Sequence, residues 1–310
     1  MLTASQALTD ATARAATFLL ERQEPDGSFV DFDLDPGPST SWTTAYVAVA
    51  LSDALPALPA SLQGDAQAAV ERAAAVLLAT QRPGGWGYNE RVATDADSTA
   101  FAVRALLRAG HAVSGCLPAL AAYVDERGEA HTFRGADQHG AWAGAHPDVT
   151  ASVGLALMEA RAMRPLRRTM LASALHGDAG DRPWTAYWWT QPCYGIALSL
   201  AWLAAEHARS DTARAGASDA LRRLEGDLSA FDLAWLVRAE GLLAGTAHAA
   251  PVLLALQRAD GGWPPSRALR LPAARPAAGL PSSCPVYADE RRLFTTASAL
   301  AALGTAAYSS

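Results

Sequence analysis

The chain has 310 residues, of which 50% are hydrophobic and 18% are charged, and its formal net charge at pH 7 is -6. This composition is typical of a globular protein with a large core and is too apolar for intrinsic disorder. The Lys and Arg residues are scattered, so the sequence lacks the basic surface that nucleic-acid binding requires. The basic stretch at residues 164–169 is typical of a helix end.

The start of the chain lacks the basic segment and the continuous apolar run of a signal peptide. No window reaches the roughly 18 uninterrupted apolar residues of a membrane span. The three cysteines, Cys116, Cys193 and Cys284, lie far apart and form no CxxC pair, which argues against a disulfide framework or a cysteine-rich zinc site. We therefore expect a cytoplasmic protein.

A unit of two helices recurs along the chain. The first helix of each unit ends in Gln, a turn with Gly and an aromatic residue follows, and a very apolar second helix then opens with Thr or Ala. The clear copies combine Phe18–Phe29 with Ser41–Leu51, Ala75–Tyr88 with Asp95–Leu107, and Val252–Pro264 with Leu293–Leu303. Weaker copies lie at His146–Met158, Trp184–Leu203 and Leu221–Leu243. A spacing of about 40 to 60 residues is typical of two-helix repeats.

The two helices of each unit differ in pattern. The first is amphipathic, which predicts an outer helix, and the second is apolar nearly all round, which predicts a buried one. An open solenoid normally presents a polar concave surface, whereas these inner helices are apolar and aromatic. We therefore predict an all-α fold, a single α/α barrel of six hairpins over residues 1–310, with an apolar cavity along its axis. No strand pattern competes with this prediction.

Three of these turns resemble the QW repeats of the squalene-hopene cyclase and prenyltransferase superfamily. They read QEPDGSF at Gln23–Phe29, QRPGGWGY at Gln81–Tyr88 and QRADGGW at Gln257–Trp263. The segment Trp184–Leu203 is similar to an aromatic stretch of bacterial class II diterpene cyclases. The resemblance implies that Gln caps the outer helix and that Trp86, Trp263 and Phe29 pack across the turn.

The stretch DADSTA at Asp95–Ala100 resembles the DxDD acid motif of class II terpenoid cyclases, closest to the barrel domain of the bacterial enzymes. By this resemblance Asp97 is the proton donor. Two features depart from the family pattern. Ser98 stands where the last aspartate of the motif is expected, and the family's full-length cyclases pair the barrel with a second helical domain, for which 310 residues leave no room.

The residues alone permit a second interpretation of this stretch. Thr94 or Asp95 is a good N-cap, and Asp97 then falls in the first helical turn, where acidic residues are common. An acid that protonates an alkene must be protonated at neutral pH. An apolar cavity and the neighbouring carboxylates Asp95 and Asp148 would raise the pKa of Asp97 enough for that role.

His146 opens the adjacent inner helix and is a third candidate catalytic residue. Bonded to Asp97, it would set the acidity of that carboxyl and later return the proton. The alternative is that His146 only flanks a helix start formed by Pro147 and Asp148, with Asp148 as a cap. The sequence leaves both open.

Aromatic residues on or near the inner helices are candidates to line the cavity, because a cation over an aromatic ring gains about 0.5–2 kcal/mol without meeting a nucleophile. Core packing is the competing interpretation at each position. The candidates are Trp42, Tyr46, Phe101, Trp142, Trp188, Trp189, Tyr194, Trp235 and Phe294.

Signals for phosphate and metal are weak. There is no P-loop and no DDxxD run, and the cysteines do not match the zinc ligands of protein prenyltransferases. Arg91, before the acid motif, is either a diphosphate ligand at the rim or a surface arginine. We therefore expect no cofactor, with Mg²⁺ needed only if the substrate carries a diphosphate.

These features predict a class II-type terpenoid cyclase that protonates an alkene or an epoxide of a linear isoprenoid and cyclises it through carbocations. The substrate is open between a prenyl diphosphate and a prenylated metabolite. The alternative is a non-catalytic isoprenoid-binding or partner subunit with the same barrel. A glycosidase would need two carboxylates about 5–10 Å apart in a polar cleft, which such apolar helices disfavour. We expect a hydrophobic isoprenoid as ligand and a homodimer, a partner subunit or a lid at Pro264–Pro285 over the barrel mouth, with peripheral membrane contact as a further option.

Overall fold

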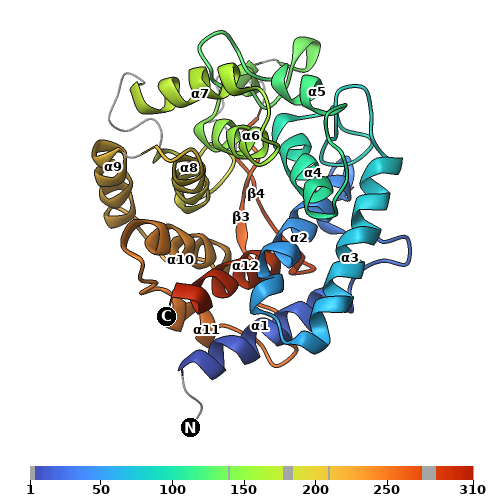
Figure 1. Ribbon diagram of the computed structural model, residues 1–310, viewed down its shortest axis with the longest axis vertical. Helices are drawn as coiled ribbons and strands as arrows, with labels where there is room; N and C mark the ends of the chain where they lie inside the picture. Colours follow the sequence, from blue (N-terminus) through green and yellow to red (C-terminus); the bar gives the residue numbers. More distant parts are fainter. Residues whose placement is uncertain (1–3, 139, 177–183, 209, 274–283, 310) are drawn as a thin grey trace.

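The computed structural model describes residues 4–138, 140–176, 184–208, 210–273 and 284–309. Twelve α-helices in these residues alternate between an inner and an outer position (Figure 1). The inner helices are α2 (Ser41–Ala54), α4 (Ala96–Arg108), α6 (Pro147–Glu159), α8 (Cys193–Ala205), α10 (Ala230–Ala244) and α12 (Leu293–Ser309). The outer helices are α1 (Ala4–Leu20), α3 (Ala60–Ala79), α5 (Leu117–Ala121), α7 (Arg164–His176), α9 (Asp211–Arg222) and α11 (Ala250–Ala255).

The inner helices pack in a closed circuit. Each one contacts the next in the chain, from α2 to α4 and on to α12, and α12 returns to pack against α2 (Figure 1). The outer helix α1 lies against both α12 and α3, so the beginning and the end of the chain meet in the circuit. The prediction of a mostly helical fold is confirmed.

The fold contains two short pairs of antiparallel strands, which corrects the expectation that the sequence encodes helices without any strands. Strands β1 (Asp31–Leu34) and β2 (Gly37–Ser39) pair with Asp31 opposite Ser39, and β3 (Arg267–Arg270) and β4 (Val286–Ala288) pair with Arg270 opposite Val286. Figure 1 shows β3 and β4 passing close to the middle of the ring. Strands of three or four residues are too short to produce an alternating pattern in the sequence.

The repeated Gln turns join neighbouring outer helices. The Gln23 amide donates to the carbonyls of Gly27 at 2.8 Å, in its own turn, and Ala69 at 2.9 Å, in α3. Gln257 makes the same pair of bonds to its own turn and to α1. The indoles of Trp86 and Trp263 are buried and each donates to a carbonyl of the preceding helix. These contacts agree with the structural role that the repeat pattern implied.

Two buried aspartates hold the start of α12. Asp31 accepts backbone hydrogen bonds from Leu293 at 2.7 Å and Phe294 at 3.1 Å, and Asp289 accepts from Thr295 at 2.6 Å. Burial raises the pKa of both carboxyls. Because Asp31 lies between α1 and α2, its bonds tie the first repeat to the last and help to close the circuit.

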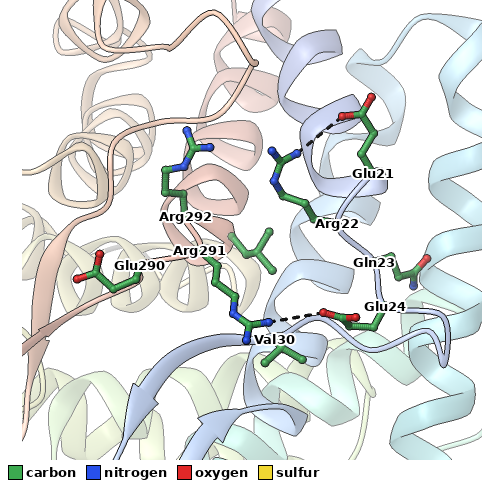
Figure 2. A pocket seen from close by; sticks show the side chains of 9 residues that line it. Glu21, Arg22, Gln23, Glu24, Val30, Glu290, Arg291 and Arg292 are labelled. Atoms are coloured by element: carbon green, nitrogen blue, oxygen red, sulfur yellow. Dashed lines mark ion pairs between the residues drawn. The ribbon is translucent and has the colours of Figure 1, made fainter.

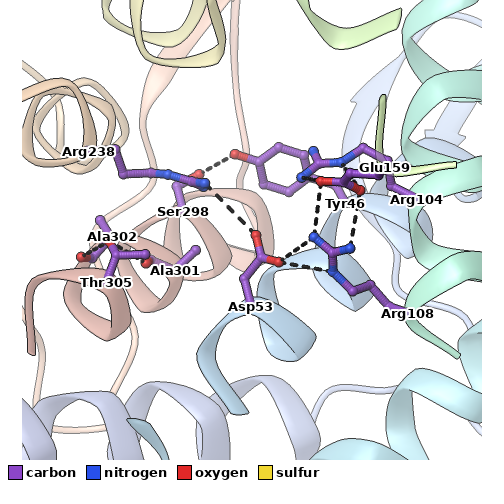
Figure 3. Close-up of polar contacts among 10 residues, drawn as sticks. All are labelled: Tyr46, Asp53, Arg104, Arg108, Glu159, Arg238, Ser298, Ala301, Ala302 and Thr305. Carbon is purple, nitrogen blue, oxygen red and sulfur yellow. Dashed lines mark hydrogen bonds and ion pairs between the residues drawn. The ribbon is translucent and has the colours of Figure 1, made fainter. Parts of the chain in front are cut away.

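The inner helices are not apolar on every side, which corrects a second expectation. Buried Arg104 of α4 donates to both carboxylate oxygens of Glu159 at 3.1 Å. Arg108 binds Glu159 and Asp53, and Arg238 lies 3.9 Å from Asp53 (Figure 3). This charge network crosses the ring near the C-terminal ends of α2, α4 and α6. None of the described helices is both long and apolar enough to cross a membrane.

Candidate active site

The candidate acid lies at the start of α4, and the preceding aspartate sets where that helix begins. Asp95 is the N-cap, with Oδ1 accepting from the Ser98 backbone N–H at 2.7 Å and Oδ2 accepting from the Ser98 hydroxyl at 2.7 Å. Asp97 therefore lies in the first turn and does not act as the N-cap. The two aspartates of the motif have different roles, and Ser98 bonds to the capping residue, Asp95.

Asp97 is held by two side chains from other inner helices. The indole Nε1 of Trp42, in α2, donates to Oδ2 at 3.0 Å, and the hydroxyl of Tyr194, in α8, donates to Oδ1 at 3.3 Å. Both partners are buried, whereas Asp97 keeps part of its surface accessible. The N-terminal ends of α2, α4 and α8 thus converge on the carboxyl of one partly buried residue.

Burial makes this carboxyl a group that can hold a proton near neutral pH. It raises the pKa of Asp97 to about 6, although the Ser152, Trp42 and Tyr194 side chains act in the opposite direction. Burial also raises the pKa of Asp95 and of Asp148 to about 7, and the negative charge of Asp97 adds to both shifts. The three carboxyls cannot all ionise without mutual repulsion, so protons are retained among them.

Asp148 reaches this group from the first turn of α6. Its Oδ1 accepts from the Val149 backbone N–H at 3.0 Å, and the side chain is buried. Helix α8 approaches it closely, because a Cβ at Gly195 would lie 3.2 Å from the Cβ of Asp148. His146, not Asp148, occupies the N-cap position of α6.

An inner aromatic cluster surrounds the donors of Asp97. The rings of Tyr46 and Phe294 stack with centroids 3.6 Å apart, Trp42 lies 4.6 Å from Phe294, and Trp189 lies 4.9 Å from Tyr194. The cluster consists of Phe32, Trp42, Tyr46, Phe101, Trp189, Tyr194, Phe231, Trp235 and Phe294. Seven of these residues were predicted from the sequence, and Phe32 and Phe231 were missed.

The two missed rings had different signals. Phe231 lies in the first turn of α10, the position that Trp42 holds in α2 and Phe294 in α12, so comparing the repeats position by position would have found it. Phe32 lies in β1, outside every helix pattern. Its ring stacks on Trp42 at 5.7 Å, a contact that only the folded chain creates.

The two remaining predicted aromatics, Trp142 and Trp188, lie in a separate outer aromatic cluster. With Phe133 and Tyr187, which were not predicted, they surround the imidazole of His146. The His146 ring stacks on Tyr187 with centroids 3.8 Å apart. The hydrogen bonds to Asp97 come from Trp42 and Tyr194. The bond between His146 and Asp97, one of the two interpretations that the sequence left open, is not formed among the described residues, where the His146 ring stacks on Tyr187. Arg91 is exposed in the loop before α4.

The described part of the expected lid lies over the outer aromatic cluster. The Arg270 backbone N–H donates to the Trp188 carbonyl at 2.7 Å, and the Trp142 indole donates to the Pro272 carbonyl at 2.7 Å. Leu269 of β3 is buried. The stretch 274–283 of the predicted lid lies outside the described residues.

The opposite end of the ring has a different chemistry. Asp53 follows Trp42 by eleven residues in α2, so the charge network lies roughly 16 Å along the axis from the Asp97 end. Beyond it, a mostly apolar hollow of about 800 Å³ is bordered by the C-terminal parts of α10 and α12. Figure 3 shows Arg238 directed at Asp53 beside α12.

A second hollow is a surface feature of charged residues. It has a volume of about 420 Å³ and lies where α1 ends and α12 begins (Figure 2). Arg22 pairs with Glu21 at 3.7 Å, and Arg291 pairs with Glu24 at 3.6 Å. Because most of its lining residues are charged or polar, the hollow lacks the apolar surface that a prenyl chain requires. Among the described residues, no group of three or more His, Cys, Asp or Glu side chains is placed to hold a metal ion.

Comparison with known proteins finds relatives by structure and not by sequence. The chain matches no family model and no curated protein sequence. The type II terpene cyclase MstE from Scytonema matches with a TM-score of 0.80 at 24% identity, over 98% of this chain and 99% of the cyclase. Variants of MstE have been solved with its substrate, geranylgeranyl dihydroxybenzoate, and with its product, merosterolic acid A.

Two further structures match. A protein from Actinoplanes is 30% identical, with a TM-score of 0.78 over 97% of this chain and 99% of its own. An ent-copalyl diphosphate synthase from Streptomyces platensis is 18% identical, with a TM-score of 0.58 over 86% of this chain and 50% of its own. The larger synthase therefore contains a region with this fold, and MstE shares the fold over its whole chain.

Proposed function

We propose that this chain, which has the fold of the type II terpene cyclases, is itself a class II-type terpene cyclase built as one six-hairpin α/α barrel. Asp97 supports this proposal most strongly. Its carboxyl is buried enough for its pKa to rise to about 6, it is oriented by Trp42 and Tyr194, and the residue as a whole is only partly buried. A helix cap needs none of these properties, and Asp95 already performs that function.

In the proposed reaction, the Asp97 O–H bond breaks and a new C–H bond forms at the terminal alkene of a linear isoprenoid. The electron pair of the alkene makes that bond, and a tertiary carbocation remains at the adjacent carbon. The next alkene attacks this carbon, so each ring closure moves the positive charge along the chain. Loss of a proton at the end returns the overall proton count to its starting value, and the reaction is an isomerisation.

The inner aromatic cluster suits the cationic stage of this reaction. Its rings offer π-faces that stabilise a cation by about 0.5–2 kcal/mol each and carry no strong nucleophile. Along α2, Tyr46 lies between Trp42, which bonds to the acid, and Asp53 of the charge network. The arginines of that network, Arg104 and Arg238, would repel a carbocation, which favours cation formation at the Asp97 end.

The substrate class follows from the apolar and aromatic surroundings and from the relative. We propose a linear prenyl chain as the reacting part, and, by analogy with the geranylgeranyl dihydroxybenzoate bound by MstE, a prenylated aromatic acid as the first substrate to test. We assign the planar head group to the outer aromatic cluster, whose rings could stack on it. Neither the acid nor the rings call for a metal ion in this scheme.

The test is incubation of the purified protein with linear prenyl compounds of increasing length, as free diphosphates and as prenylated hydroxybenzoates. A cyclase converts a substrate into a product of identical mass with fewer alkenes, detected by chromatography, mass spectrometry and NMR. A prenyl-binding subunit would instead protect the ligand unchanged and shift the melting temperature. Binding without any conversion across the whole panel would refute the enzymatic proposal in favour of that alternative.

A further inference from the structure

His146 carries an unexplained buried nitrogen. Only 7% of the residue is exposed, and its Nε2 has no hydrogen-bond partner among the described residues. Leaving a buried polar group unpaired costs about 1–3 kcal/mol, so each such group in a folded protein calls for an explanation. The helix does not supply one, because the His146 side chain makes no capping bond at the start of α6.

The surroundings keep this imidazole neutral and dry. Tyr187 covers one face at 3.8 Å, and Trp188 meets it edge-on at 5.9 Å. Burial, with a smaller contribution from His131, lowers the pKa of His146 to about 4. At neutral pH the ring is therefore uncharged, with a proton on one of its two nitrogens.

A short chain of contacts links His146 to the acid. The backbone N–H of Ala96, the residue before Asp97, donates to the Thr132 carbonyl at 2.9 Å. The Thr132 hydroxyl accepts from the Trp188 indole at 3.0 Å, and Trp188 packs on His146. The two titratable groups thus lie at the starts of neighbouring helices, Asp97 in the first turn of α4 and His146 at the N-cap of α6, but in separate aromatic clusters.

We propose that His146 Nε2 is the base that ends the reaction by removing a proton from the final carbocation, an assignment that rests on the proposed cyclase function. One C–H bond beside the cationic carbon breaks, its electron pair forms the product alkene, and the proton goes to Nε2. Asp97 has by then lost one proton and His146 has gained one, so the sum is neutral. Both groups return to their starting states by exchange with water after product release.

A weak base is sufficient for this step. The C–H bonds beside a carbocation are extremely acidic, so the acceptor needs a free lone pair and correct placement more than high basicity. The low pKa of His146 keeps the ring uncharged, and Nε2 is not engaged by any described residue, so the tautomer protonated at Nδ1 presents its lone pair there. The separation from Asp97 also prevents the base from neutralising the acid before the substrate arrives.

The experiment replaces His146 by Phe, which retains a ring to stack on Tyr187 and removes both nitrogens. The exposed residue His111 provides the matched control, as His111→Phe. Products from a substrate that the wild type cyclises are quantified, and incorporation of deuterium from D₂O is measured alongside. We expect His146→Phe to incorporate one deuteron as before, because Asp97 is intact. The ratio of the wild-type alkene to water-captured alcohols and other alkene isomers should fall at least about tenfold, in line with the loss of a general base.

The outcomes separate the possible roles. Unchanged products with a raised KM would assign His146 to head-group binding, and unchanged products with a lowered melting temperature would assign it to structure; either result overturns the base assignment. If His146→Phe does not fold, His146→Gln, which keeps a polar side chain without a basic nitrogen, is judged by the same product ratio. Conversion of no substrate by wild-type protein would overturn the proposed function and this assignment together, whereas wild-type conversion with an unaffected variant overturns this assignment alone.

Discussion

The Trp42 indole donates a hydrogen bond to Oδ2 of Asp97 at 3.0 Å, across the interface of α2 and α4. This bond favours the carboxylate over the acid and so lowers the pKa of Asp97 against the larger effect of burial. Trp42 therefore adjusts the strength of the proposed acid as well as offering a π-face. A pH profile separates these two contributions.

Replacing Trp42 by Phe removes the donor and keeps an aromatic ring. We expect the pKa of Asp97 to rise, so that the loss of kcat with increasing pH, set near pH 6 in the wild type, moves upward by about one unit. The control is Phe294→Leu, which removes a ring without touching Asp97 and should lower kcat at every pH equally. A Trp42→Phe profile that coincides with the wild-type profile would show that the bond does not tune the acid.

Stability should depend on pH through the buried carboxyls. The pKa of Asp148 is raised from 3.8 to about 7 in the folded protein, so the folded state binds more protons than the unfolded state between these values, and stability falls as pH rises through this window. The lowered pKa of His146 acts in the opposite direction below pH 6.5, so the wild type alone does not isolate the effect. In Asp148→Asn the group no longer ionises. The stability advantage of this variant over the wild type should grow from pH 4 to pH 7, by at most about 1.4 kcal/mol per unit, and then level off.

Urea unfolding of both proteins at pH 5, 6, 7 and 8 measures this difference. A constant difference between the two unfolding free energies across that range would mean that Asp148 is not protonated in the fold. The same pH series for Asp95→Asn would not isolate the effect of ionisation on stability, because that change also alters the N-cap of α4.

The charge network at the far end should stabilise the fold strongly. Glu159 accepts from Arg104 and Arg108, and the Arg104 side chain is 4% exposed. Glu159→Gln removes the negative charge that these arginines pair with in a buried site. We expect it to lower the free energy of unfolding by about 3–5 kcal/mol. The comparison is Arg222→Met, which breaks an exposed pair with Asp219 worth at most about 1 kcal/mol. Chemical denaturation of the two variants side by side checks the prediction, and equal losses would contradict it.

The inner helices could be predicted from sequence because their apolar residues are local signals that recur with each repeat. The charge network could not, since Arg104 and Glu159 lie 55 residues apart and only the ring brings them together. The same holds for Asp31, which reaches α12 across more than 260 residues. An isolated charge in an apolar helix shows no partner until the fold provides one.

The roles of neighbouring residues in the acid motif also could not be assigned from the sequence alone. The four residues Asp95 to Ser98 predicted both a helix cap and a proton donor, and the structure separates the two by assigning the cap to Asp95. The aromatic candidates, in contrast, were taken as one set, although Trp142 and Trp188 lie in the outer cluster and Trp42 and Tyr194 in the inner one. Sequence spacing does not reveal which loop residues turn toward the acid.

The central claim, that Asp97 starts the reaction by giving its proton to an alkene, is tested most directly by deuterium transfer. Wild-type protein and Asp97→Asn are each equilibrated in D₂O and incubated with the same linear prenyl substrate. Asn is nearly the same shape and has no acidic proton to give, so the variant should fold, bind and leave the substrate uncyclised. The wild-type product should carry one deuterium on the ring methylene next to the carbon that bears the two methyl groups, because the proton adds to the CH carbon of the terminal alkene; NMR locates it. A wild-type product without deuterium at that position, or folded Asp97→Asn protein that cyclises at the wild-type rate, would contradict the claim.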